Sequence, residues 1–389
     1  MEIYFDNAAT TQCCNAAADI MRKVLISDFG NPSSLHRKGM EAERYISDAR
    51  KKIAGLMKVK EKEIIFTSGG TESNNLALLA AADSQKRRGN HIITTRIEHP
   101  SVAMPIKKLQ EKGFEVTFLP ADSFGRIRLS DIQDALCKDT ILVSIMHINN
   151  ELGTIQPIEE AATLIHAFDP NILFHVDAVQ SFGKQNLRPI SMGIDLLSAS
   201  AHKIHGPKGV GFLYIKDKLT LSPIMYGGGQ QRGLRQGTEN VPAIAGFGEA
   251  ALQSYALLET KTKHLQNLQN LFLKQICEIE GVSVNGAIAQ SDQLVYAAPH
   301  ITSIRVADIR SEVLLHSLEE YGIYISAGSA CASNKREISQ TLLAAGLNKN
   351  EIDTTVRFSF CADNTIEEVE TAVKALKEII PIRRKFVRK

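Results

Sequence analysis

The sequence predicts an α/β protein with a mostly parallel, seven-stranded sheet wrapped by helices, together with a smaller α+β unit. Between Ile64 and Ile215, short apolar runs alternate with stretches of helical pattern, as is typical of strands joined by crossover helices. A long amphipathic segment follows, and shorter strand and helix patterns come after it. This order favours one large layered unit and a second, smaller one.

Seven apolar runs supply the expected strands of the sheet. They read IIFTS, HIITT, VTFLP, ILVSIMHI, ILFHVD, DLLSAS and VGFLYI. The stretches between them, such as Ser73 to Ala82 and Glu159 to Phe168, are long enough for crossover helices. Because ligands of such sheets gather at the carboxyl ends of the strands, we expect the functional residues there.

The smaller unit begins with an expected single helix from Ala243 to Glu278, in which apolar residues recur at helical spacing. Further strands are expected at Ser303–Val306, Tyr324–Ser326 and Val356–Phe360, and further helices at Ser311–Tyr321 and Ile366–Ile380. Strands and helices in this mixture form a compact α+β arrangement.

The composition excludes several classes of protein. Hydrophobic residues make up 44% of the 389 and charged residues 23%, which is ordinary for a globular chain. With 45 basic and 43 acidic residues, no overall field draws the protein to nucleic acid or to an anionic membrane. No targeting pattern and no apolar stretch near the roughly 20 residues of a membrane span is visible, so we expect a cytoplasmic protein. Six scattered cysteines without a CxxC pair indicate reduced thiols.

Three motifs point to chemistry at the ligand edge of the sheet. In the first, the strand IIFTS runs into GGTESNN and then into a helical pattern, so that backbone N–H groups meet Gly70 and the Thr71 hydroxyl. Such a turn can cradle a phosphate. An ordinary tight turn is equally compatible with this motif alone.

The second motif, ILFHVDAVQ, ends a buried strand with Asp177. A carboxylate in that position needs a cationic partner, and a protonated pyridine nitrogen is one candidate. A helix N-cap or a Mg²⁺ ligand explains the aspartate about equally well when the motif is taken alone.

The third motif, SASAHKIHGPKG, places Lys203 at the end of a strand, where burial and a nearby cation would lower its pKa. Ser200 and His202 beside it could hold phosphate oxygens. A surface lysine would be the simpler interpretation of this motif alone. Together, a phosphate cradle, a pyridine carboxylate and a Schiff-base lysine are the parts that pyridoxal 5'-phosphate (PLP) requires.

At this point the chain resembles a known family over most of its length. The motifs DNAATT, NPSSLH, TSGGTESNN, EHPSV, NNELGTIQP, HVDAVQ, SASAHKIHGPKG, GGGQQRGLRQGTEN and SAGSACAS are similar to those of cysteine desulfurases of the NifS and IscS type. These belong to the class-V aminotransferase family of fold-type I PLP enzymes. The resemblance implies a homodimer with a large PLP-binding domain at residues 15–257. Residues 1–14 and 258–389 would form a small domain that carries a mobile cysteine loop.

The resemblance also implies a role for particular residues. Those that match phosphate-binding positions are Gly70, Thr71, Ser200 and His202, with Thr238 reaching the phosphate of the neighbouring subunit. Asp177 matches the partner of the pyridine nitrogen, Gln180 and Asn150 lie near the phenolic oxygen, and His99 stacks on the ring. Arg357, with Asn150, would bind the substrate carboxylate, since a guanidinium holds a carboxylate in a bidentate manner. No metal is expected.

Cys331 lies in SAGSACASNK, whose small residues predict a mobile, exposed loop. The family's reaction converts L-cysteine to L-alanine, and the resemblance implies that Cys331 takes the sulfur as a persulfide. An acceptor protein, either an iron-sulfur scaffold or a tRNA thiolation enzyme, would then receive it. The alternatives are a selenocysteine lyase, an aminotransferase or a non-catalytic sulfur-transfer scaffold.

Three departures from the family pattern are visible. Cys13 and Cys14 stand where family members commonly have a proline-containing stretch, residues 334–340 differ from the usual sequence after the loop cysteine, and Cys361 replaces a small residue. These leave the PLP chemistry intact and leave the acceptor open. Cys361 is either a second sulfur carrier or a small residue at the end of a strand, and we favour the latter.

Overall fold

The structure is a computed structural model that describes residues 2–286, 296–327 and 338–387. Its seven-stranded sheet has the strand order β2-β8-β7-β6-β5-β3-β4. The strands are β2 (Ile64–Thr67), β3 (His91–Thr95), β4 (Glu115–Leu119), β5 (Thr140–Met146), β6 (Leu173–Asp177), β7 (Leu196–Ser200) and β8 (Gly211–Ile215). β8 runs in the opposite direction to the other six strands, which all point the same way. The predicted seven-stranded, mostly parallel sheet is therefore confirmed.

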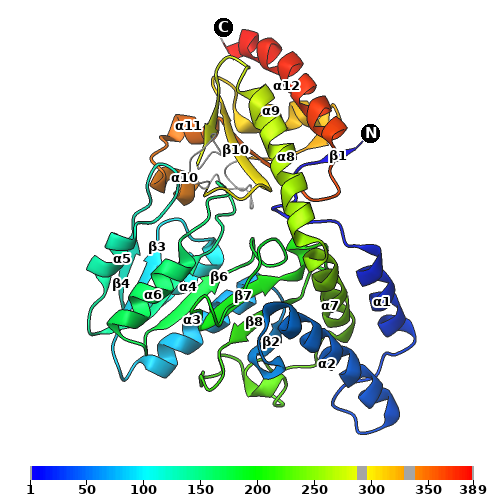
Figure 1. The fold of residues 1–389 in the computed structure, drawn as a ribbon, viewed down its shortest axis with the longest axis vertical. Helices are drawn as coiled ribbons and strands as arrows, with labels where there is room; N and C mark the ends of the chain where they lie inside the picture. Colours follow the sequence, from blue (N-terminus) through cyan, green and yellow to red (C-terminus); the bar gives the residue numbers. More distant parts are fainter. Residues whose placement is uncertain (1, 287–295, 328–337, 388–389) are drawn as a thin grey trace.

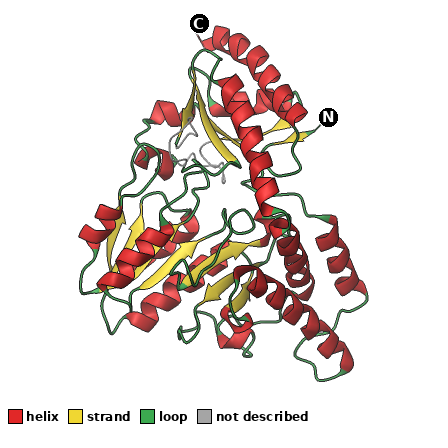
Figure 2. Cartoon of the chain, in the orientation of Figure 1, coloured by secondary structure: helices red, strands yellow, loops and turns green. Residues whose placement is uncertain are grey.

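Helices cover both faces of this sheet (Figure 2). They are α1 (Asn15–Ile26), α2 (Arg37–Met57), α3 (Gly70–Gln85), α4 (Pro100–Glu111), α5 (Leu129–Ala135), α6 (Ile158–Phe168) and α7 (Val241–Tyr255). Neighbouring strand residues face opposite cores: Ile93 packs in one hydrophobic cluster and Ile92 in another. Because both faces are buried, the strands appear in the sequence as continuous apolar runs. We call this sheet and its helices the large unit.

The small unit contains α8 (Leu258–Ile276) and the remaining elements towards the C-terminus (Figure 1). Its four-stranded sheet has the order β12-β13-β10-β9. The elements are β9 (Val282–Asn285), β10 (Ile301–Val306), α9 (Ser311–Glu319), β11 (Ile323–Tyr324), β12 (Ser326–Ala327), α10 (Gln340–Ala344), α11 (Lys349–Asp353), β13 (Thr355–Ser359) and α12 (Ile366–Val387).

The N-terminal segment belongs to the small unit by packing. β1 (Ile3–Tyr4) pairs in parallel with β11, and Ile3 and Phe5 lie in the hydrophobic cluster of the small unit. The chain therefore starts in the small unit, crosses to the large unit and returns through α8, as Figure 1 shows.

The prediction of one helix over residues 243–278 is wrong. α7 ends at Tyr255, and α8 begins after Leu257, whose backbone is left-handed with φ 54°. Apolar residues of α7 such as Phe247 pack in the core of the large unit, whereas Phe272 of α8 packs in the small unit. The break lets each half face its own core, which outweighs the continuous helical periodicity.

The other expected elements of the small unit differ only in detail. The strand expected at residues 324–326 is two short strands, β11 and β12, and α12 extends seven residues beyond Ile380 to Val387. Among the described residues, no helix combines the length and the apolar character needed to cross a membrane.

Candidate active site

A cavity of about 390 Å³ lies where β2 leads into α3 and where β7 ends. The residues predicted to bind phosphate, Gly70, Thr71, Ser200 and His202, all line it. Thr10, Ser68 and Lys208 also line it and were missed by the sequence analysis. Each of the three lies within a motif already singled out, so their place in DNAATT, TSGG and HGPKG was the available signal.

The turn into α3 is shaped for a close approach. Gly69 has φ 154°, and a Cβ added at Gly70 would come within 2.6 Å of Val179 Cγ2. α3 begins at Gly70, so the positive end of its dipole faces the cavity together with the ammonium group of Lys208. The cavity therefore fits a phosphate group.

Asp177 ends β6 and is 5% exposed. Its Oδ2 accepts a hydrogen bond from Asn74 Nδ2 at 2.8 Å, and its Oδ1 accepts one from the Val179 amide at 3.0 Å. No lysine, arginine or histidine of the described residues forms an ion pair with it. A buried carboxylate without a cationic side chain suits a cationic ligand group such as a protonated pyridine nitrogen.

Asn74 connects Asp177 to His99 through Ser101. Asn74 is fully buried, and its Nδ2 donates both to Asp177 and to Ser101 Oγ, the latter at 2.9 Å. His99 Nδ1 lies 2.7 Å from Ser101 Oγ and accepts a hydrogen bond from the Ser101 amide at 3.1 Å. Nδ1 is thus an acceptor, so the neutral imidazole carries its proton on Nε2.

Burial lowers the pKa of His99, and Lys203 lowers it further, whereas Asp177 opposes the change. The neutral imidazole is therefore the favoured form. Asn74 and Ser101 were missed by the sequence analysis. They lie within the motifs TESNN and EHPSV, yet only their burial and contacts reveal what they do.

Glu98 is a second buried carboxyl near Asp177. Its Oε1 accepts hydrogen bonds from Thr95 Oγ1 at 2.8 Å and from the Met146 amide at 2.9 Å. Burial raises the pKa of Glu98 to about 8, despite these hydrogen bonds. Because Glu98 is then protonated at neutral pH, it adds no second negative charge beside Asp177.

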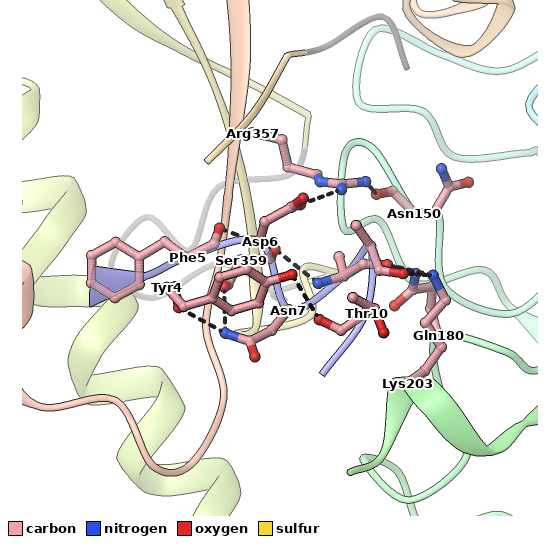
Figure 3. Close-up of polar contacts among 12 residues, drawn as sticks. Tyr4, Phe5, Asp6, Asn7, Thr10, Asn150, Gln180, Lys203, Arg357 and Ser359 are labelled. Carbon is pink, nitrogen blue, oxygen red and sulfur yellow. Dashed lines mark hydrogen bonds and ion pairs between the residues drawn. The ribbon is translucent and has the colours of Figure 1, made fainter. Parts of the chain in front are cut away.

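Lys203 ends the short helix η2 (Ala201–Lys203) directly after β7. Its Nζ donates to the carbonyl oxygens of Ala8 and Ala9, both at 2.7 Å. Gln180 Nε2 donates to the same Ala8 oxygen at 2.9 Å (Figure 3). Burial, and then Arg357, lower the pKa of Lys203 to about 8, although Asp6 and Asp177 act in the opposite direction. A half-buried lysine with a lowered pKa suits imine chemistry.

Arg357 of β13 joins the small unit to this site, as Figure 3 shows. It is 8% exposed, and it donates to the Asn150 carbonyl oxygen at 2.6 Å and to Asp6 Oδ1 at 2.9 Å. Its Nε is buried and has no hydrogen-bond partner in the described part of the chain. A guanidinium with N–H groups left over can still bind a carboxylate of a ligand.

Comparisons with known proteins agree with this geometry. A model of the family Aminotransferase class-V matches residues 3–372. The cysteine desulfurase IscS of Dictyoglomus turgidum is 40% identical over 97% of this chain and 94% of its own. The chain belongs to the class-V aminotransferases, among the cysteine desulfurases.

Two solved structures of this family have the same fold. One, a NifS-like protein, has a TM-score of 0.92 and 37% identity, covering 98% of this chain and all of its own. The other, SspA in complex with cysteine, has a TM-score of 0.80 and 35% identity, covering 94% of this chain and all of its own. Class-V aminotransferases are PLP-dependent, and the cavity, Asp177 and Lys203 fit that cofactor.

Only four of the predicted site residues line the cavity itself. The contacts described above involve His99, Asn150, Asp177, Gln180, Lys203 and Arg357. Thr238 is exposed and does not line the cavity. Cys331 lies outside the described residues. The candidate site in this structure therefore consists of the cavity together with Asp177, His99, Lys203 and Arg357.

Proposed function

We propose that this enzyme holds PLP on Lys203, removes the sulfur of L-cysteine and leaves L-alanine, with the sulfur first bound as a persulfide on Cys331. The observation that carries the proposal is the convergence of three features: a phosphate-sized cradle, the buried Asp177 and the amine of Lys203. Arg357 adds a cationic group for the carboxylate of an amino acid.

Each of these residues has a distinct task in the proposed reaction. When bound, PLP supplies an electron sink that stabilises negative charge at the α-carbon of the substrate. Asp177 keeps the pyridine nitrogen protonated, and Arg357 holds the substrate carboxylate. Lys203, released by the incoming substrate amine, takes the α-proton. His99, which carries its proton on Nε2, assists further proton transfers.

The sulfur leaves by attack of the Cys331 thiolate. The new S–S bond forms as the C–S bond of the substrate breaks, and the electron pair of that bond is protonated on the product side, which yields alanine. The persulfide sulfur then passes to an acceptor protein, an iron-sulfur scaffold or a tRNA thiolation enzyme.

We also infer a cytoplasmic homodimer in which Thr238 completes the phosphate site of the neighbouring subunit. The exposure of Thr238 in the single chain supports this inference.

We further infer that the chain divides into two domains at residues 14/15 and 257/258. The two hydrophobic clusters of the large unit and the separate cluster of the small unit support this division.

The replacement Lys203→Ala tests the proposal. We expect loss of alanine formation and of cofactor that can be fixed to the protein by borohydride, because the proposal assigns the imine to the Lys203 amine. Lys208→Ala is the matched control: it also lines the cavity but should keep the borohydride-fixed cofactor. Cofactor fixed to another lysine in Lys203→Ala would contradict the assignment.

A further inference from the structure

Three metal-ligating side chains meet behind the cofactor lysine, on the loop after Lys203 and on the turn after β13. One ligand atom each from His205, Cys361 and Asp363 lies within 4.8 Å of the other two. His205 and Cys361 are half-buried and Asp363 is exposed, so the group is open to solvent on one side. None of these residues takes part in the proposed cysteine chemistry.

His205 is held in the orientation and tautomer of a metal ligand. Its Nδ1 lies 3.0 Å from the Gln12 carbonyl oxygen, so Nδ1 carries the proton and Nε2 keeps its lone pair. Metal-bound histidines commonly donate their second ring N–H to a backbone carbonyl in this way. The backbone of His205 is left-handed with φ 63°, an uncommon conformation for a non-glycine residue.

The backbone of His205 is held by hydrogen bonds on both of its peptide groups. The His205 amide donates to Thr11 Oγ1 at 2.7 Å, and the His205 carbonyl oxygen accepts a hydrogen bond from the Cys14 amide at 2.9 Å. A left-handed residue persists when its surroundings determine it in this manner, and such residues cluster at functional sites.

Cys361 is supported in a corresponding way by the turn that follows it. Burial raises the pKa of the Cys361 thiol to about 11, and the backbone N–H groups of Asp363 and Asn364, which are directed at the sulfur, oppose that rise. The Cys361 amide donates to Asn364 Oδ1 at 2.8 Å. N–H donors around a sulfur stabilise a metal-bound thiolate. Cys361 is also one of the positions at which the sequence departs from the family pattern.

The charges around the group select the kind of metal. Lys184 acts electrostatically on Cys361 and His205, and Lys261 acts on Asp363 and His205. Two nearby ammonium groups oppose any cation that is held by charge alone, which disfavours Mg²⁺ and Ca²⁺. A thiolate, an imidazole and one carboxylate instead suit a cation with affinity for sulfur.

We propose that His205, Cys361 and Asp363 form a Zn²⁺ site whose fourth position is taken by water. Ligand atoms around tetrahedral Zn²⁺ are about 3.5 Å apart. The three ligand atoms must therefore move roughly an ångström closer to one another, and a rotation of the exposed Asp363 side chain can provide this movement. Bound Zn²⁺ would tie the loop after Lys203 to the turn after β13, the strand that carries Arg357. We therefore expect Zn²⁺ to raise the unfolding temperature of the holoenzyme.

The test measures Zn²⁺ bound to the holoenzyme by equilibrium dialysis, without cysteine or thiol reductants. We expect one Zn²⁺ per chain, unaffected by a large excess of Mg²⁺. Cys361→Ser and His205→Asn should weaken the affinity at least about tenfold, the loss of one strong ligand. Asparagine tolerates the left-handed backbone, so His205→Asn removes the ligand without new strain. Cys277→Ser, at an exposed free cysteine elsewhere, is the matched control.

Two further variants keep the test decisive. Asp363→Asn changes an exposed side chain and should weaken Zn²⁺ binding without affecting the fold. Cys331→Ser should retain the bound Zn²⁺. Co²⁺ in place of Zn²⁺ should give the intense visible absorption of a tetrahedral site, and Cys361→Ser should lose it. Unchanged affinity in Cys361→Ser and Asp363→Asn, or loss of binding in Cys331→Ser, would overturn the proposal.

Discussion

At the scale of single residues, the fully buried Asn74 has an unusual position in the site. Its amide nitrogen serves the carboxylate of Asp177 and the hydroxyl of Ser101 at once, while its Oδ1 is buried and has no partner among the described residues. Asn74 thus leaves its Oδ1 acceptor without a hydrogen bond within the described ranges while its Nδ2 donates to two groups of the candidate site. One donor atom therefore orients both the Asp177 carboxylate and the Ser101 hydroxyl that lies beside His99 Nδ1.

We predict that Asn74→Ala lowers kcat by about 10- to 100-fold with little change in KM. A hydrogen bond to a charged group contributes on the order of 1.5–3 kcal/mol, which corresponds to that range. The loss acts on Asp177 and on the Ser101 hydroxyl beside His99, and it spares Arg357, the residue proposed to bind the substrate carboxylate. Steady-state kinetics of alanine formation measures kcat and KM separately, and the His99 tautomer should persist because the Ser101 amide still donates to Nδ1.

The neighbouring Asn75→Ala is the matched control for this prediction. Asn75 is on the same helix and donates to the Thr71 carbonyl at 2.9 Å and, more weakly, to the Ser101 carbonyl at 3.4 Å. Among the described residues, no hydrogen bond joins it to Asp177. We expect less than about a threefold change in kcat, since an exposed hydrogen bond contributes little. An equal fall of kcat in both variants would assign Asn74 a general stabilising effect instead.

At the scale of elements, the break between α7 and α8 stores strain at one residue. Leu257 is left-handed and 74% exposed, so its side chain gains little from burial, while a left-handed conformation costs a non-glycine residue about 1–2 kcal/mol. The connection between the two units therefore includes an unfavourable backbone conformation at Leu257.

We predict that Leu257→Gly stabilises the protein by up to about 1 kcal/mol, because the relief of strain exceeds the added chain entropy of glycine. Leu252→Gly, in the helical interior of α7, should destabilise it by about 1 kcal/mol or more. The unfolding midpoints of the holoenzyme variants measure both effects. Destabilisation of similar size in both variants would show that Leu257 is not strained.

The sequence could predict the sheet but not the helix break. The seven apolar runs correspond to the seven strands, because six of the strands are buried along their whole length and are therefore mostly apolar. The edge strand β4 is only partly buried. The residues before and after Leu257 continue one helical periodicity, and only packing against two different cores separates them. Short-range patterns contain no information about which core a helix will face.

The same distinction applies to the site. Gly70, Asp177 and Lys203 follow strands, so their place at the sheet edge could be predicted from sequence position. Arg357 and Asn150 came from the resemblance alone. The protonation of Glu98, the bridge through Asn74 and the meeting of His205 with Cys361 depend on burial and on contacts between distant segments. No local pattern predicts them.

At the scale of the whole molecule, the site is assembled where the two units meet. Asp6 of the N-terminal segment and Arg357 of β13 form an ion pair at 2.9 Å, and Arg357 also bonds the loop of Asn150 in the large unit. The Ala8 and Ala9 carbonyl oxygens of the same N-terminal segment hold Lys203. A relative movement of the units would therefore change the substrate clamp and the cofactor lysine together.

The central claim is that this molecule moves sulfur from cysteine to its own thiol, and intact-protein mass spectrometry after exposure to L-cysteine tests it most directly. We predict a gain of one sulfur atom per chain, mapped to Cys331 by peptide analysis and accompanied by L-alanine. Cys331→Ala should not gain it. Alanine formed without sulfur on Cys331, or a persulfide on Cys361 that persists in Cys331→Ala, would contradict the account.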